Sequence, residues 1–197
     1  MNRLQKKYQQ EIISTLKKEW KLKNNLAVPK ITKIIINLGI KDGAGDKGVA
    51  QKIQQYISLI AGQKAIVTKA RKAEAAFKTR KGDHIGVMAT LRGNKMYQFF
   101  DKLVSIVLPR VRDFQGVKRT AFDGHGNYSL GFQEQIVFPE VDYDKIDQVR
   151  SLQVTIVTNA NDDKKALRLL ELLGMPFEKI KEKKPASTRK TKSTRGQ

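Results

Sequence analysis

The glycine-rich segment 43–48 has the spacing G-x-G-x-x-G, which in dinucleotide-binding folds presents backbone N–H groups to a pyrophosphate. Two observations argue against such a site. Asp42 and Asp46 would repel phosphate, and the basic stretch Lys69-Ala70-Arg71-Lys72 stands where an acid that binds ribose is expected. We therefore interpret the segment as a connecting loop. A nucleotide-binding enzyme remains the alternative, and saturable binding of NAD or ATP would reveal it.

Carboxylates and histidines offer the remaining chemistry. Asp123 and His125 could exchange a proton, but the glycines between and beside them indicate an exposed turn rather than a pocket that shifts a pKa. A run of acids could bind a metal, although we favour docking of a basic protein; it comprises Glu140, Asp142, Asp144 and Asp147. With no cysteine and two histidines, the chain lacks the ligands of a typical metal cage. The sequence thus predicts no catalysis, metal or other cofactor.

The charge balance predicts a polyanionic partner. The 197 residues include 39 Lys and Arg against 19 Asp and Glu, a formal net charge of +20. Nucleic acid is favoured because each neutralised phosphate releases a counterion. A membrane surface is the weaker alternative, because no basic helix has a strongly apolar opposite face. The N-terminus resembles no secretory signal, which predicts a cytoplasmic protein without a membrane span.

Two segments concentrate this charge. Lys69 to Lys81 predicts a long, mobile, basic loop that approaches RNA closely, with Phe77 available for stacking; its cations are Lys69, Arg71, Lys72, Lys78, Arg80 and Lys81. A merely solvated charge run is the alternative. From Glu178 onward, eight basic residues oppose two acidic ones, a net +6. We expect residues 178–197 to be a disordered extension that orders on an anion, threading along rRNA.

Periodicity predicts the elements that position these residues. Helical spacing favours helices over residues 4–20, 49–61, 96–107 and 164–173, with Asn94 as an N-cap and Pro109 as a terminator. Strands are expected at 31–40, 65–68, 85–92, 128–132, 135–138 and 152–158. This order predicts an α+β domain over residues 1–177, a largely antiparallel β-sheet with helices packed on one face.

Alternation assigns the two faces of the sheet. The apolar set Ile34, Ile36 and Leu38, with Thr32, is expected to face the core. Asn37, Thr90 and Arg92 then share the opposite face, where neighbouring strands would bring them together. Such a polar patch can recognise RNA, and an ordinary solvent-facing surface explains the spacing equally well.

Several strings, in order and without large gaps from about Leu4 to Phe177, resemble the bacterial form of the universal L5 family of large-subunit ribosomal proteins. They are Ile35–Gly39, Gly62–Lys64, Thr68–Lys72, Thr90–Gly93, Pro109–Phe114, Phe122–Tyr128, Phe138–Lys145 and Met175–Phe177. His125 and His84 depart from the family, which usually has Arg and often Pro at these positions. The extension from Glu178 lies beyond the usual family end.

The resemblance implies a structural protein of the large ribosomal subunit, bound to 5S rRNA in the central protuberance beside 23S rRNA and other proteins there. It implies 5S rRNA contacts at Asn37, Gln63, Thr90 and Arg92. It further implies that loop 68–82 reaches P-site tRNA. A contact with the small-subunit head protein S13 is implied for loops 110–116 and 140–147, through Arg110, Arg112, Glu140, Asp142, Asp144 and Asp147. A general RNA chaperone or DNA-compacting protein is the alternative; it would bind all duplexes equally at equal salt.

Overall fold

The fold is built on a five-stranded antiparallel sheet. In the computed structural model, which describes residues 2–40, 47–142 and 146–178, the strand order is β2-β3-β1-β5-β4. The strands are β1 (Ile31–Gly39), β2 (Ile66–Lys69), β3 (His84–Leu91), β4 (Tyr128–Phe132) and β5 (Leu152–Thr158). Every neighbouring pair is antiparallel, with β1 in the centre. The predicted α+β class is confirmed.

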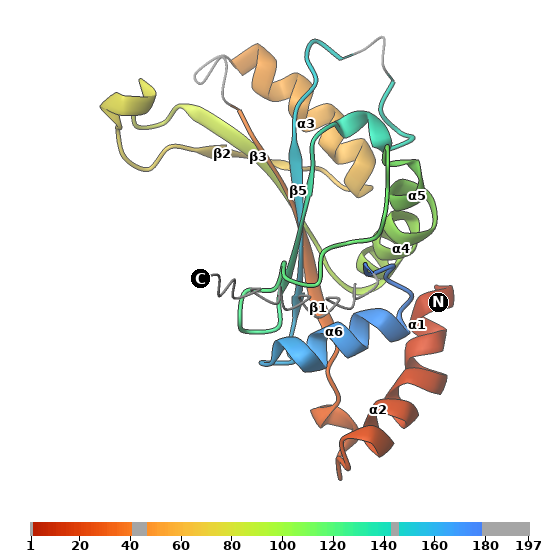
Figure 1. Ribbon diagram of the computed structural model, residues 1–197. Helices are drawn as coiled ribbons and strands as arrows, with labels where there is room; N and C mark the ends of the chain where they lie inside the picture. Colours follow the sequence, from red (N-terminus) through yellow and green to blue (C-terminus); the bar gives the residue numbers. More distant parts are fainter. Residues whose placement is uncertain (1, 41–46, 143–145, 179–197) are drawn as a thin grey trace, which may run out of the picture.

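Helices pack on one face of this sheet (Figure 1). The first is a nearly continuous run, α1 (Arg3–Lys7), the π-helical η1 (Tyr8–Ile12) and α2 (Ile13–Glu19). Further along lie α3 (Lys47–Ala61), then α4 (Gly93–Lys102), the π-helical η4 (Leu103–Val107) and α5 (Leu108–Arg110), and finally α6 (Asp163–Leu172). Short 3-10 turns are η2 (Asn25–Ala27), η3 (Ala75–Phe77) and η5 (Gln135–Val137).

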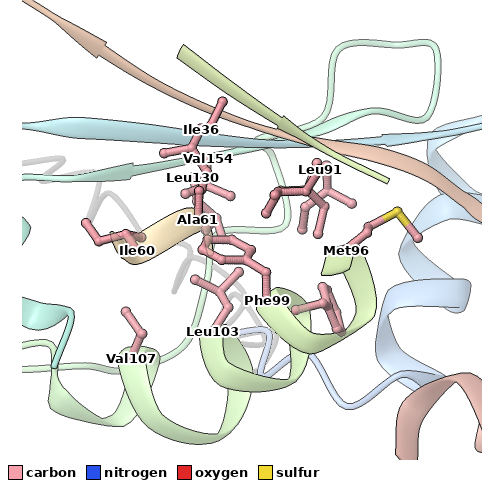
Figure 2. Close-up of a cluster of buried hydrophobic side chains, with 14 of the residues drawn as sticks. Ile36, Ile60, Ala61, Leu91, Met96, Phe99, Leu103, Val107, Leu130 and Val154 are labelled. Atoms are coloured by element: carbon pink, nitrogen blue, oxygen red, sulfur yellow. The ribbon is translucent and has the colours of Figure 1, made fainter. Parts of the chain in front are cut away.

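The core lies between the sheet and these helices (Figure 2). Ile36, Leu91 and Val154 point from the sheet toward Phe99 and Leu103 of the α4–η4 helix, and all five are at most 3% exposed. Burying one such side chain contributes about 1.5–3 kcal/mol. Because strands and helices share this core, the sheet has one covered face and one that the helices leave open.

Helix ends follow the residue types that the sequence supplies. Gly62, just after α3, has φ +63°, a left-handed conformation that glycine adopts without a Cβ clash. The Asp162 side chain caps α6 by accepting a 3.0 Å hydrogen bond from the Lys164 N–H, and Gly174 follows that helix with φ +98°. The predicted ends of both helices are confirmed within a residue or two.

Two predictions about the strands are wrong. Thr32 is exposed rather than directed at the core, because the register of β1 against β5 shifts between Ile31 and Lys33 and inserts an extra residue. The expected strand 135–138 is the 3-10 turn η5. Gln135 is fully buried there, where its side chain donates to the Gln148 carbonyl and accepts from the Arg150 N–H.

The α4–α5 helix also differs from expectation. It begins at Gly93, one residue before Asn94, and has no side-chain N-cap. Pro109 lies inside α5 rather than ending the helix. The preceding η4 residues are helical, so Pro109 lies in the last turn of one continuous helical run, which ends one residue later at Arg110.

Candidate functional site

The open face of the sheet carries the polar residues that alternate with the core set. The register aligns two rows across the strands. One row is Thr90, Ile35, Thr155 and Ser129, and the other is Met88, Asn37, Gln153 and Gly131. Asn37, Gln153 and Gly131 are exposed and the other five are half-buried. We call these eight residues the open sheet face.

Amide and hydroxyl groups dominate its polar chemistry. Asn37 and Gln153 lie directly opposite each other on β1 and β5, so two amides, each both donor and acceptor, meet at the centre of the sheet. Ser129 and Thr155 hydroxyls are 3.2 Å apart. This face has no carboxylate among its eight residues. It therefore suits a partner that offers both hydrogen-bond donors and acceptors.

The four residues predicted to recognise RNA gather at one side of this face. Asn37 and Thr90 lie on the adjacent strands β1 and β3. Gln63, in the turn after α3, donates a 2.8 Å hydrogen bond from Nε2 to the main-chain carbonyl of Thr90. Arg92 is exposed, two residues along the chain from Thr90. The structure thus brings together residues that the sequence separates by up to 55 positions, from 37 to 92.

Sequence reasoning missed Gln153, Thr155 and Ser129. The signal was present, because apolar Leu152, Val154 and Ile156 alternate with polar residues in the predicted strand 152–158, and the residues between them must face the other way. The sequence could not show which strands lie next to β5 in the sheet. Only the β1–β5 and β4–β5 pairings bring these side chains beside Asn37.

The β2–β3 hairpin extends beyond the rest of the sheet as an arm (Figure 1). Its tip, residues 70–83, contains η3 and a small antiparallel bridge between Glu74 and Thr79, so it has more internal order than the irregular loop we expected. Phe77 is 77% exposed at this tip. The six cations predicted for this arm are all exposed, namely Lys69, Arg71, Lys72, Lys78, Arg80 and Lys81.

The base of the arm requires a glycine. Gly86 pairs with both Gly39 of β1 and Thr68 of β2. A Cβ at this position would lie 2.8 Å from the Leu38 carbonyl oxygen and 3.0 Å from the Thr68 hydroxyl, which is closer than atoms pack. The close approach of three strands therefore depends on the absence of a side chain.

The acidic segment 140–147 is partly neutralised by lysines of the same chain. Glu140 forms an ion pair with Lys102, and Asp147 pairs with Lys52 at 3.0 Å. Asp144 lies outside the described residues. On the neighbouring loop, Arg110 and Arg112 are exposed. Glu140 and Asp147, both predicted to contact a small-subunit protein, thus already have basic partners within the chain.

The turn at 123–127 is held by carboxylates. Asp123 accepts from the His125 and Asn127 N–H groups and from the Asn127 amide, and these bonds lower its pKa to about 2. Asp163 accepts from the N–H groups of Gly124 and Gly126 at 3.2 and 2.9 Å. Asp123 therefore serves as a fixed hydrogen-bond acceptor, and a carboxylate with this pKa is a poor proton donor or base near neutral pH.

Two further features lie partly outside the described residues. The glycine-rich segment is described only from Lys47, where α3 begins, and the extension only at Glu178. Across the described ranges, no three His, Cys, Asp or Glu side chains converge as metal ligands. None of the helices in those ranges combines the length and apolarity needed to cross a bilayer.

Comparison with known proteins identifies similarity along most of the chain. Residues 24–80 match the family model described as ribosomal protein L5, and residues 84–177 match the model for the C-terminus of the same ribosomal family. Proteins named large ribosomal subunit protein uL5 from two strains of Chloroflexus aurantiacus are 50% identical over 175 residues, covering 89% of this chain and 97% of theirs. The protein of that name from Campylobacter jejuni subsp. doylei is 52% identical over 181 residues, 92% of this chain and all of its own.

Proposed function

Because this chain belongs to the ribosomal protein L5 family, and is thereby a structural constituent of the large ribosomal subunit, we propose that it binds 5S rRNA through the open sheet face. Its family is structural, and the chain is not an enzyme. The observation that carries the proposal is the convergence of Asn37, Thr90 and Arg92 on the side of the sheet that the described helices leave open, with Gln63 at its edge.

The chemistry of this face suits folded RNA. Amides such as Asn37 and Gln153 can pair with base edges, and hydroxyls such as Thr155 can exchange hydrogen bonds with ribose 2′-OH groups. Arg92, at the edge of the face, can form paired hydrogen bonds with a phosphate or a guanine. Charge alone would attract any polyanion, whereas these neutral groups supply the selectivity.

The β2–β3 arm is proposed to contact P-site tRNA. Six exposed cations on this projecting arm can reach a phosphate backbone that lies away from the body of the protein. Exposed Phe77 adds a ring that can stack on a base or pack on a ribose. The arm and the open sheet face are thus proposed to bind different RNAs.

Contacts with the small-subunit head protein S13 are proposed for the loops at 110–116 and 140–147. Arg110 and Arg112 are exposed, and Arg112 lies 4.0 Å from the Asp113 carboxylate. Glu140 and Asp147 would exchange their ion pairs with lysines of this chain for ion pairs with basic groups of the partner. 23S rRNA and the other proteins of the central protuberance complete the proposed surroundings. We further propose that the extension 178–197, with its excess of Lys and Arg, runs along rRNA.

The decisive experiment is binding to folded 5S rRNA in competition with tRNA and a random duplex, at several salt concentrations near physiological strength. Preference for 5S rRNA that persists as salt rises supports the proposal. Equal affinity for the three RNAs, falling together with salt, would replace it with general RNA binding of the kind expected from a chaperone. Cross-linking of the extension within assembled ribosomes tests its path separately, and an extension that yields no RNA cross-links contradicts that part.

A further inference from the structure

The turn that joins α2 to β1 exposes a group of lysines. Residues 17–33 contain six lysines and one acid, a net +5, and the acid Glu19 is already bound by Arg168. Four of the lysines are exposed and have no side-chain partner within the described part of the chain. We call them the lysine corner, Lys18, Lys21, Lys23 and Lys30. The corner lies at the end of the molecule opposite the β2–β3 arm (Figure 1).

Hydrogen bonds fix the backbone that carries the corner. Lys17 reaches across the turn, and its Nζ donates to Asn25 Oδ1 at 2.8 Å. Asn24 caps η2 by accepting from the Leu26 N–H at 2.9 Å. The Tyr8 hydroxyl donates to the Pro29 carbonyl at 3.0 Å and so ties the turn to the first helix. A ligand would therefore meet lysines whose backbone positions are already set, which lowers the entropic cost of binding.

Lys21 occupies a position that favours glycine. Its φ is +49°, and the Leu22 N–H bonds the Lys17 carbonyl, the arrangement in which helices commonly end with glycine. The helix does not require this charge, since Lys17 and Lys18 already supply cations in the last turn of α2. A lysine in a strained backbone conformation, with its side chain exposed, points to a ligand for the ammonium group.

We propose that the lysine corner binds the phosphate backbone of rRNA and extends the RNA contact of the open sheet face. This inference rests on the proposed function. Continuity supports RNA rather than an acidic protein, because Lys33 follows the corner along β1 on the same side as Ile35 and Asn37. Leu26, 82% exposed beside the lysines, provides an apolar surface that can pack on a ribose or base.

The test compares two sets of three substitutions in the full chain. One is Lys18→Gln, Lys21→Gln and Lys23→Gln, and the matched control is Lys47→Gln, Lys118→Gln and Lys164→Gln, which are exposed lysines on two helices and a loop. Affinity for folded 5S rRNA and for a random duplex is measured over a salt series. The RNA affinity of the corner variant should be lower than that of wild type by about tenfold or more near 0.1 M salt. The slope of log affinity against log salt should become less steep by about 2. The control should lose clearly less.

The outcomes separate the two proposals. Wild-type protein without preference for 5S rRNA contradicts the proposed function, yet the corner is still tested by the salt dependence on either RNA. Equal losses of RNA affinity in the two triple variants overturn the inference about the lysine corner, even if the protein still prefers 5S rRNA. A separate variant, Lys21→Gly, should raise the urea midpoint by relieving the backbone while lowering RNA affinity. Unchanged affinity in this variant also overturns the inference.

Discussion

Gln63 and Thr90 are joined by a 2.8 Å hydrogen bond from the Gln63 amide to the Thr90 main-chain carbonyl. The bond links the turn after α3 to the last residues of β3, where that strand leads into α4. It places Gln63 at the edge of the open sheet face even though Gln63 belongs to no strand. A residue outside the sheet thus positions the strand end that carries Thr90 and Arg92.

Gln63→Met should weaken binding of 5S rRNA about fivefold, corresponding to about 1 kcal/mol for a lost hydrogen bond and a less constrained strand end. Titration of labelled 5S rRNA measures the change. Gln54→Met is the matched control, because the Gln54 amide makes a comparable 2.7 Å bond to the Ala65 carbonyl, away from the open sheet face. Equal loss of RNA affinity in the two variants would show that Gln63 acts only through stability.

Arg92→Ala and Lys72→Ala should separate the two proposed RNA surfaces. Arg92 lies at the open sheet face, so its loss should cost about 1–3 kcal/mol in 5S rRNA binding. Lys72 lies on the arm, so the substitution Lys72→Ala should leave the affinity for 5S rRNA unchanged and should weaken the contact with tRNA. Parallel titrations with 5S rRNA and with tRNA-bound ribosomes measure both effects. Equal losses of 5S rRNA affinity would refute the division between face and arm.

Gly86→Ala should destabilise the protein by about 1–3 kcal/mol, because the added Cβ meets the Leu38 carbonyl oxygen, a main-chain atom that cannot move aside. Urea denaturation measures the free energy of unfolding. Gly131→Ala is the control, since a Cβ on that β4 glycine has no atom within 4 Å. Similar stability of the two variants would mean that the strands at the base of the arm separate readily.

Much of the fold could be predicted because alternation and helical spacing record which side of each element is buried. Thr90 and Arg92 lie on the face opposite the buried Val87, Ala89 and Leu91, as their alternation predicts, whereas Ile85 of the same strand is exposed. The predicted face of Thr32 is wrong because a bulge inserts one residue into β1. The alternation of apolar and polar residues does not reveal a bulge. The burial of Gln135 could not be predicted for another reason. Its side chain forms hydrogen bonds with main-chain groups of another segment, at Gln148 and Arg150.

The candidate site was predictable only in part. Asn37 and Thr90 could be assigned to one face from their own strands. Their juxtaposition with Gln63 and Gln153, however, depends on contacts between segments far apart in sequence. Resemblance to the family supplied Gln63, whose position in a turn leaves no periodic signal. The charges of the lysine corner can be read directly from the sequence. The left-handed backbone conformation of Lys21, however, is visible only in the structure.

An ion pair between Glu19 of α2 and Arg168 of α6 predicts a pH-dependent contribution to stability. Two guanidinium nitrogens, Nε and Nη2, bond the two carboxylate oxygens at 3.1 and 2.7 Å. These hydrogen bonds lower the pKa of Glu19 below its ordinary value of 4.5. A lowered pKa in the folded state means that folding favours the charged form. The contribution of the ion pair to stability is therefore present above about pH 4.5, and it is lost as the pH falls through the lower pKa of Glu19 in the folded state.

Glu19→Gln should accordingly reduce the free energy of unfolding at pH 7 by less than about 1 kcal/mol, because the pair is partly exposed and solvent screens it. The difference from wild type should shrink as the pH falls below 4, and high salt at pH 7 should also reduce it. Urea denaturation at several pH values measures the effect, with Glu11→Gln as the control on the same helical run, where the side chain forms no ion pair within the described residues. A deficit that stays constant down to pH 2 would mean that Glu19 contributes through packing rather than charge.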